Sequence, residues 1–417
     1  MIKEIKNKFE KLFLVFLYLQ PILDVSSGIL LHFNISITTS SIVRFLFMFL
    51  CLIYLIFCIR DKKINIYIIL LGIYFGLYTS TILIIKDTAA LGYEIKNLLT
   101  TFYFPIVLIT LAALYKNKNF DIKHLNILYM LYLLFVFIPN ILNLGFVSYA
   151  YSKVGNTGWF LSANVVGSII SILLPIILIY IKKIDIKIII IALINIYVVM
   201  YIGTKVPVLS LALIIGVNLI YYIITLIKRK KIALLSIILI PTLLMIVCST
   251  FIIPRTSFYK NLVIHINFLN EQTNNNIDKK LFVDHFIFSQ RLTFEENTRM
   301  AFNASKPIEK VLGIGYIENY STDQVSIKTV EIDYFDVFYR HGIVGFTLFF
   351  LPLVIMMKKI ILSFKKIDYN TLNIMLSITL IFVLALFQGH IFITPANSIY
   401  VALILALVYN KKIKGTI

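Results

Sequence analysis

The sequence predicts an all-α, polytopic membrane protein with about twelve transmembrane helices, and three observations support this prediction. Of the 417 residues, 60% are hydrophobic and only 14% are charged, and the mean hydropathy is +0.92. These values exclude a water-soluble domain. Apolar runs recur along the whole chain, and each is long enough to cross the roughly 30 Å hydrocarbon core as a helix. Alternating segments of about ten residues, which would indicate an outer-membrane barrel, are missing from the sequence.

The expected helices are separated by short polar stretches. They lie near residues 9–31, 41–59, 64–85, 98–115, 124–142, 161–181, 187–203, 206–227, 232–253, 335–357, 371–388 and 396–410. The first run follows a lysine-rich start, as a signal peptide does, but it is too long and contains Gln20, Pro21 and Asp24. We therefore interpret it as a transmembrane helix.

The positive charge is distributed in a pattern that predicts the topology. The formal net charge is +19, and the Lys/Arg clusters fall in alternate loops, beginning at the N-terminus and ending at Lys411, Lys412 and Lys414. This positive-inside pattern places both termini in the cytoplasm. The basic residues are expected to contact anionic membrane lipid, and their distribution is not a nucleic-acid footprint.

One connection is much longer than the others. It runs from about residue 254 to 334 and carries nearly equal numbers of acidic and basic side chains. We expect a single integral membrane domain over residues 1–417, with 254–334 as a large extracytoplasmic loop between the ninth and tenth helices. Within the loop, the stretch from Phe282 to Phe302 has apolar residues at near-helical spacing, which predicts a helix lying along the surface.

The strongest local pattern lies in and after this loop. It consists of Ser289-Gln290-Arg291, Lys306-Pro307, Gly313-Ile314-Gly315 and the segment Arg340-His341-Gly342-Ile343-Val344-Gly345. In the order and spacing of these motifs the sequence resembles the O-antigen ligase and O-antigen polymerase superfamily. The resemblance implies a GT-C-like membrane glycosyltransferase that needs no metal or cofactor. Such an enzyme transfers an oligosaccharide from a polyprenyl diphosphate carrier to a sugar hydroxyl on the outer face of a bacterial cytoplasmic membrane.

Two family positions differ in this chain. The family histidine, eleven residues before Gly342, corresponds to Glu331, and Asp333 follows two residues later. The family's Ser-Arg at the outer start of a helix corresponds to Thr204-Lys205, which keeps the positive charge but loses the bidentate guanidinium. The segment Gly155–Asn164 also looks like the external helix entry of these proteins.

The chemistry gives its own reasons for these residue types. Release of a diphosphate at the membrane surface requires cations, and Arg291, Arg299 and Lys205 are the candidates. The acceptor hydroxyl requires a base, for which Glu331 and Asp333 are equal candidates. In an extended chain these two carboxylates would share a face and one cavity.

Further residues are candidate substrate contacts, each with a structural alternative. Arg340 and His341 begin the tenth helix, where a local Asp336–Arg340 ion pair is the alternative for Arg340. His390 either binds substrate or caps a helix. Trp159, the single tryptophan, either stacks on a sugar ring or belongs to the interfacial aromatic belt.

An intramembrane carboxylate also needs explanation. Asp24 lies within the first helix, and Arg44 is similarly placed in the second. A structural Asp24–Arg44 ion pair is favoured over a substrate contact.

Three alternatives concern the function as a whole. Within the family, the richness in Ile, Lys and Asn favours a bacterium without lipopolysaccharide and hence a polymerase over a ligase. A polysaccharide or lipid transporter would share the helix number, but transport requires polar residues through the bilayer centre, whereas the ionisable residues here gather at the outer edge. A membrane acyltransferase would rely on His32. Other polysaccharide-assembly membrane proteins are possible partners.

Overall fold

The computed structural model describes residues 2–35, 39–86, 88–116, 120–149, 153–181, 185–230, 250–272, 279–317, 328–363 and 368–409. Over this part of the chain the protein is helical and contains no β-strand, apart from one isolated bridge between Val147 and Asn156. The all-α prediction is confirmed for these residues.

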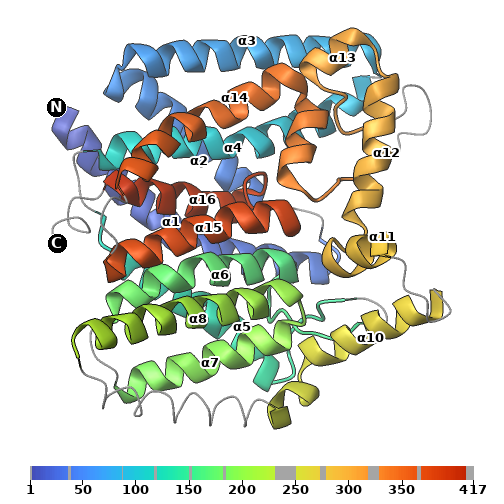
Figure 1. Cartoon of the computed structure of the whole chain (residues 1–417). Coiled ribbons are helices and arrows are strands. Elements are labelled where there is room, and N and C mark those ends of the chain that lie inside the picture. The colour runs from blue at the N-terminus through green and yellow to red at the C-terminus, as the bar shows by residue number, and fades with distance from the viewer. Residues whose placement is uncertain are drawn as a thin grey trace.

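The long helices run side by side as a bundle (Figure 1). They are α1 (Ile2–His32), α2 (Thr39–Tyr54) with its π-helical extension η1 (Leu55–Ile59), α3 (Lys62–Ile85), α4 (Leu91–Tyr115), α5 (Lys123–Ile141), α6 (Ala163–Tyr180), α7 (Ile186–Ile202), α8 (Lys205–Lys228), α14 (Asp333–Ser363), α15 (Tyr369–Phe387) and α16 (Pro395–Ala406). Among the described residues, nine helices are long and apolar enough to cross a membrane, while α7 and α16 are shorter. The protein is thus a multi-pass membrane protein. The expected helix at 232–253 lies largely outside the described residues, so the count of twelve stays a prediction.

The core is formed around the shortest of these helices. Every residue of α16 from Ala396 to Ala406 is buried, and α16 packs against α4 and α6, with α15 lying against α6. By contrast, α3 and α8 expose many leucine and isoleucine side chains on their outer faces. Exposed apolar faces of this kind are stable where lipid covers them.

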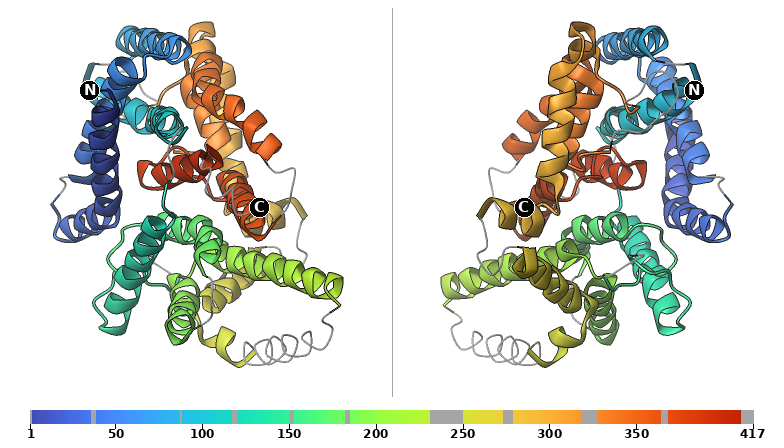
Figure 2. Two further views of the ribbon diagram at one scale, coloured as in Figure 1. Left: turned by 90° about the vertical axis from the view of Figure 1, so that its left-hand side faces the viewer. Right: turned by 90° about the vertical axis from the view of Figure 1, so that its right-hand side faces the viewer.

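Short helices gather at one end of the bundle, at the end opposite to the start of α1 (Figures 1 and 2). They are η3 (Ile253–Arg255), α10 (Ser257–Gln272), α11 (Lys279–Phe282), η4 (Val283–Ile287), α12 (Arg291–Ala304) and α13 (Pro307–Leu312). The expected surface helix over 282–302 is interrupted, because Ser289 and Gln290 both have positive φ and turn the chain before α12 begins at Arg291. α12 then runs across the ends of the long helices.

A buried ion pair attaches these short helices, called the end cap from here on, to the bundle. Lys86 and Glu94 lie 2.8 Å apart with both side chains almost fully buried. Lys86 Nζ donates to the carbonyl of Ile314 at 2.7 Å, and Glu94 accepts the backbone N–H groups of Tyr316 and Ile317. The Gly313-Ile314-Gly315 motif is thereby held on α3 and α4.

Backbone contacts explain the glycines in two motifs. Gly313 has a φ of +110°, and a Cβ atom there would lie 2.0 Å from the Arg340 carbonyl oxygen. Gly342 has a φ of +64° and kinks α14, and a Cβ atom there would lie 2.5 Å from the Val311 carbonyl oxygen. The end of α13 and the start of α14 therefore pack backbone to backbone, which only glycine permits.

The predicted Asp24–Arg44 ion pair is present. Arg44 Nη2 donates to Asp24 Oδ1 at 2.6 Å, and Arg44 Nε donates to Gln20 Oε1 at 2.9 Å. The pair joins α1 to α2 inside the bundle, where each charge needs the other to offset its desolvation.

Candidate functional site

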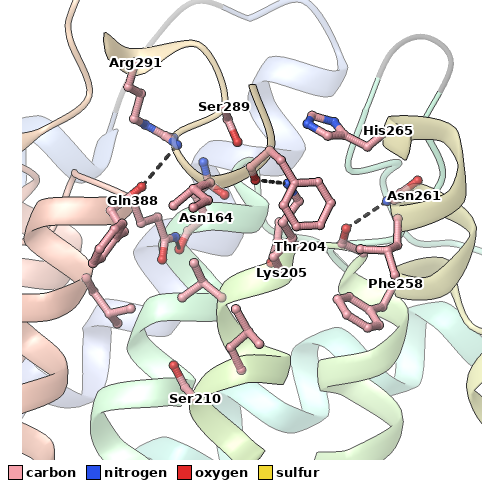
Figure 3. A pocket seen from close by; sticks show the side chains of 18 of the residues that line it. Asn164, Thr204, Lys205, Ser210, Phe258, Asn261, His265, Ser289, Arg291 and Gln388 are labelled. Atoms are coloured by element: carbon pink, nitrogen blue, oxygen red, sulfur yellow. Dashed lines mark hydrogen bonds between the residues drawn. The ribbon is translucent and has the colours of Figure 1, made fainter. Parts of the chain in front are cut away.

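A cavity of about 550 Å³ opens where the end cap meets the bundle (Figure 3). Its walls come from the segment before α6, the α7–α8 junction, α10, the η4 segment with Arg291, and the outer part of α15. Thus segments that are far apart in the sequence, including both Thr204-Lys205 and Arg291, face one space.

Three cationic side chains line the cavity and none of the lining residues is Asp or Glu. The cations are Lys153, Lys205 and Arg291. Lys205 is the first residue of α8, and its Nζ donates to the Phe286 carbonyl at 2.5 Å and lies 4.3 Å from the centre of the Phe286 ring. Burial, together with the nearby Arg291 charge, lowers the pKa of Lys153. Such mutual repulsion is relieved when an anion binds.

Arg291 is held by three acceptors. Its Nη1 donates to the carbonyls of Phe288 and Phe387 at 3.2 and 3.3 Å, and its Nη2 donates to Glu331 Oε2 at 2.8 Å. The side chain of Arg291 is 8% exposed and that of Glu331 is 30% exposed. Arg291 Nε is buried and has no hydrogen-bond partner among the described residues. One guanidinium donor therefore remains for a ligand.

Other buried polar atoms at the cavity are also unpartnered among the described residues. They are Thr204 Oγ1 and Gln388 Oε1, whose residues are only 5% and 2% exposed. Thr204 is the N-cap of α8, but its hydroxyl accepts from none of the first N–H groups of the helix, which an N-cap side chain usually satisfies in part. A buried polar atom without a partner is costly, and a polar ligand would supply the missing bonds.

Helix α10 closes the cavity on one side. Asn261 joins it to the bundle, because its Nδ2 donates to the carbonyls of Val154 and Gly203 at 2.6 and 2.8 Å. His265, one turn further, contacts the His285 carbonyl through Nε2 at 2.5 Å. Burial and the Lys205 charge lower the pKa of His265 to about 4, so this imidazole is neutral at pH 7.

The cavity is apolar away from the cations. Its deeper part lies between α8 and α15 and is lined by Leu209, Leu213, Leu380, Val383 and Leu384. In Figure 3, Arg291 lies at the upper end, Lys205 lies below it, and Ser210 lies lower still along α8. The cavity thus joins a cationic end to an apolar groove between two membrane-spanning helices.

The two predicted carboxylates have different surroundings. Glu331 has a φ of +60° and is paired with Arg291. Asp333 is fully buried, and its carboxylate accepts the N–H groups of His390, Ile391 and Phe392 at 2.6, 2.8 and 2.6 Å. The positive φ of Glu331 interrupts the extended path that would have placed both side chains on one face.

The predicted substrate contacts at the start of α14 are fully buried outside the cavity. Arg340 donates to the carbonyls of Gly315 and Lys328. His341 lies within hydrogen-bond distance of the Tyr74 and Tyr316 hydroxyls at 3.2 and 3.0 Å. Asp336, the other member of the expected local ion pair, accepts the N–H groups of Val330 and Glu331. In this structure Arg340 and His341 hold the loop that carries the Gly-Ile-Gly motif.

The remaining predicted residues also lie outside the cavity lining. Arg299 is on the solvent-facing side of α12, 3.8 Å from Glu295, and its side chain is 52% exposed. Trp159 contacts the Phe135 ring. His390 lies in the turn between α15 and α16, and its backbone N–H group donates to Asp333. Among the described residues, no group of three or more His, Cys, Asp or Glu side chains could hold a metal ion.

The sequence did not single out Lys153, Asn261, His265 or Gln388 as members of this site. Lys153 precedes the Gly155–Asn164 segment, whose likeness to an external helix entry was a usable signal. Gln388 directly precedes Gly389-His390, which was noted only for its histidine. Asn261 and His265 lie four residues apart on α10, on one face of the helix, but a single sequence does not show what that face contacts.

Comparisons with known proteins identify the family of the chain. Searches of curated proteins and of solved structures found no match to the chain. A family model described as "O-antigen ligase like membrane protein" matches residues 6–287 and 280–413. The match covers nearly the whole chain, and the protein therefore belongs to the family of O-antigen ligase-like membrane proteins.

Proposed function

We propose that this protein transfers an oligosaccharide from a polyprenyl diphosphate carrier to a sugar hydroxyl on the outer membrane face, as a polymerase of surface polysaccharide. Family membership supports a glycosyltransferase of polysaccharide synthesis. The observation that carries the finer proposal is the cavity that joins Lys153, Lys205 and Arg291 to an apolar groove between α8 and α15.

The cationic end suits a diphosphate. The free Nε of Arg291, the two ammonium groups and the first turn of α8 can together donate hydrogen bonds to phosphate oxygens. Because no carboxylate lines the cavity, the positive charge there is not cancelled by the lining itself. Among the described residues Thr204 Oγ1 and Gln388 Oε1 have no partner; the Thr204 hydroxyl can donate to a phosphate oxygen, and Gln388 Oε1 can accept from a hydroxyl of the first sugar.

The apolar groove suits the carrier chain. Leucine and valine side chains of α8 and α15 line it, and each buried CH₂ group of a lipid contributes about 0.8 kcal/mol. The polyprenyl chain would lie between these two helices, with its diphosphate at Arg291 and its sugar toward the end cap.

The proposed reaction is a single displacement. The acceptor hydroxyl oxygen forms a bond to the anomeric carbon of the donor, and the bond from that carbon to the diphosphate oxygen breaks. The diphosphate leaves with the electron pair, and its negative charge is stabilised by the three cations. The hydroxyl proton passes to the Glu331 carboxylate, which is freed when Arg291 turns to the diphosphate. We choose Glu331 because Asp333 is fully buried and already accepts three N–H groups.

The experiment uses the full-length protein in lipid nanodiscs with lipid-linked saccharide extracted from a producing strain. We expect release of polyprenyl diphosphate together with longer saccharide on the carrier, and Lys205→Ala should reduce both. A single addition to a different acceptor would identify a ligase instead. If the protein left the saccharide unchanged but moved it between the leaflets of vesicles, the transporter alternative would replace this proposal.

A further inference from the structure

A second cavity, lined in part by polar side chains, adjoins the N-terminal end of α6. Its volume is about 190 Å³. Five of its polar lining residues, here called the polar wall, are Asp24, Ser27, Ser40, Arg44 and Tyr132. Its apolar lining residues, here called the apolar wall, come mainly from α6 and the segment just before it. The proposed transfer reaction uses none of these side chains.

The side chains of the polar wall bond to one another but keep some hydrogen-bonding groups free. Arg44 Nη2 donates to Asp24 Oδ1 at 2.6 Å, and the Tyr132 hydroxyl donates to Asp24 Oδ2 at 3.2 Å. The Ser27 hydroxyl donates to Ser40 Oγ at 2.9 Å, which leaves the Ser40 hydroxyl proton free to donate. Arg44 Nη1 donates to no group among the described residues. The wall thus offers a cationic donor, a hydroxyl donor and a carboxylate acceptor side by side.

The charge balance distinguishes this cavity from the first one. Its one cation and one anion are paired, so it offers no net charge to an anion such as a diphosphate. A sugar suits it better, because each sugar hydroxyl both donates and accepts, and the hydroxyls can bond to a guanidinium and a carboxylate at once. The C–H face of the sugar ring would rest on Val165, Val166 and Phe160 of the apolar wall.

The turn between α15 and α16 runs from one cavity to the other. Gln388, at the end of α15, lines the first cavity, and Thr394, before α16, lines the second. The turn between them is held by Asp333 through the three N–H groups described above. Gly389 in this turn packs so closely on Glu331 that a Cβ atom would lie 2.2 Å from the Glu331 carbonyl oxygen. The proposed base therefore lies against the segment that separates the two cavities.

We infer that the second cavity binds the acceptor sugar, with Asp24 and Arg44 contacting its hydroxyls. This inference rests on the proposed function, since it assigns the second substrate of that reaction. It also gives the intramembrane Asp24–Arg44 pair a ligand in addition to its role in joining α1 to α2.

Cysteine protection tests the two cavities separately. Ser162→Cys reports on the second cavity, which Ser162 lines, and Ser289→Cys reports on the first. Each is made in a chain whose native Cys51, Cys58 and Cys248 are replaced by alanine. Labelling by a maleimide is timed in nanodiscs with no addition, with polyprenyl diphosphate alone, and with extracted lipid-linked saccharide.

We expect the saccharide-bearing lipid to slow labelling at both positions, by about tenfold at ten times its Kd. Polyprenyl diphosphate alone should protect only Ser289→Cys. If polyprenyl diphosphate protected Ser162→Cys as well as the saccharide-bearing lipid does, the second cavity would be a site for the lipid chain and the inference would be wrong. The inference would also be wrong if neither compound protected Ser162→Cys. Loss of protection at Ser289→Cys would instead contradict the proposed function.

A paired substitution tests the polar wall itself. Replacing Asp24 by Leu and Arg44 by Met removes both charges together, which avoids an unpaired buried charge. This double variant should lose saccharide protection at Ser162→Cys and keep polyprenyl diphosphate protection at Ser289→Cys, and the latter also shows that the chain is folded. Unchanged protection at Ser162→Cys in the double variant would contradict the role of Asp24 and Arg44.

Discussion

Arg291→Lys is the substitution that best separates the geometry of the cavity from its charge. The lysine keeps the positive charge beside Lys153 and Lys205, so long-range attraction of a diphosphate is retained. It has one nitrogen where arginine has three, and the arginine uses all of them. Nη1 and Nη2 reach two carbonyls and Glu331, while Nε remains for the ligand. A lysine has no second nitrogen with which to keep the Phe288 and Phe387 carbonyls while it leaves Glu331 and donates to the diphosphate.

The size of the effect follows from the bond that is lost. A hydrogen bond to a charged group contributes about 1.5–3 kcal/mol, and each 1.4 kcal/mol corresponds to about tenfold. We therefore expect kcat/KM for transfer to fall by about 10- to 150-fold in Arg291→Lys. Arg291→Ala should fall further, because it also removes the charge and leaves Glu331 without its partner.

The assay measures transfer from extracted lipid-linked saccharide by protein in nanodiscs, at equal amounts of folded protein. Arg299→Lys is the matched control, because Arg299 is exposed, pairs only loosely with Glu295 at 3.8 Å and lies outside the cavity. It should remain within about twofold of wild type, as exposed ion pairs contribute about 0–1 kcal/mol. If Arg291→Lys also stayed within that range, the contact between this guanidinium and the diphosphate would be refuted.

Three further predictions concern the base, the pH dependence and the orientation. Glu331→Gln should keep donor binding and slow transfer by about 10²- to 10⁴-fold, whereas Asp333→Asn should chiefly lower the melting temperature; similar transfer rates for Glu331→Gln and wild type would exclude Glu331 as the base. Folding lowers the pKa of His265 to about 4, so the contribution of its neutral form to stability is complete above the ordinary histidine pKa of about 6.5 and is lost as pH falls toward 4. Over this pH range the melting temperature should therefore decline less steeply in His265→Gln than in wild type, and parallel curves of melting temperature against pH would contradict the assignment. Met300→Cys, on the exposed side of α12, should react with an impermeant maleimide in intact cells, while Lys8→Cys should react only after permeabilisation; the reverse pattern would overturn the positive-inside topology.

The bundle could be predicted from the sequence because its signal is local. Each apolar run is long enough to span a membrane, and most described runs form helices close to the expected bounds. The exceptions are α1 and α4, which begin seven residues earlier than expected, and α14, which ends six residues later. The Asp24–Arg44 pair was also predictable, since two opposite charges within adjacent apolar runs must find each other in a low-dielectric interior. The break at Ser289-Gln290 could not be predicted, because neither residue is a glycine, the residue that usually marks a position of positive φ.

The site was only partly predictable because its residues meet over long separations. Motif order placed Lys205 and Arg291 together, and they do line one cavity. The roles of Glu331 and Asp333 could not be separated, because both lie just before the helix that the sequence predicts at 335–357. They differ because the N–H groups of His390, Ile391 and Phe392 reach one of them and not the other. Arg340 and His341 are ionisable residues near a membrane boundary, and only tertiary contacts reveal that they support a loop.

The Arg291–Glu331 ion pair has a consequence for product release. Three cations around a diphosphate would bind it tightly, and polyprenyl diphosphate is the leaving product of the proposed transfer. Glu331 is an anion on the same chain, 2.8 Å from Arg291, so it competes for the guanidinium at a high effective concentration. Each turnover can therefore end with the carboxylate reclaiming Arg291, which weakens the hold on the spent carrier and clears the groove for the next donor.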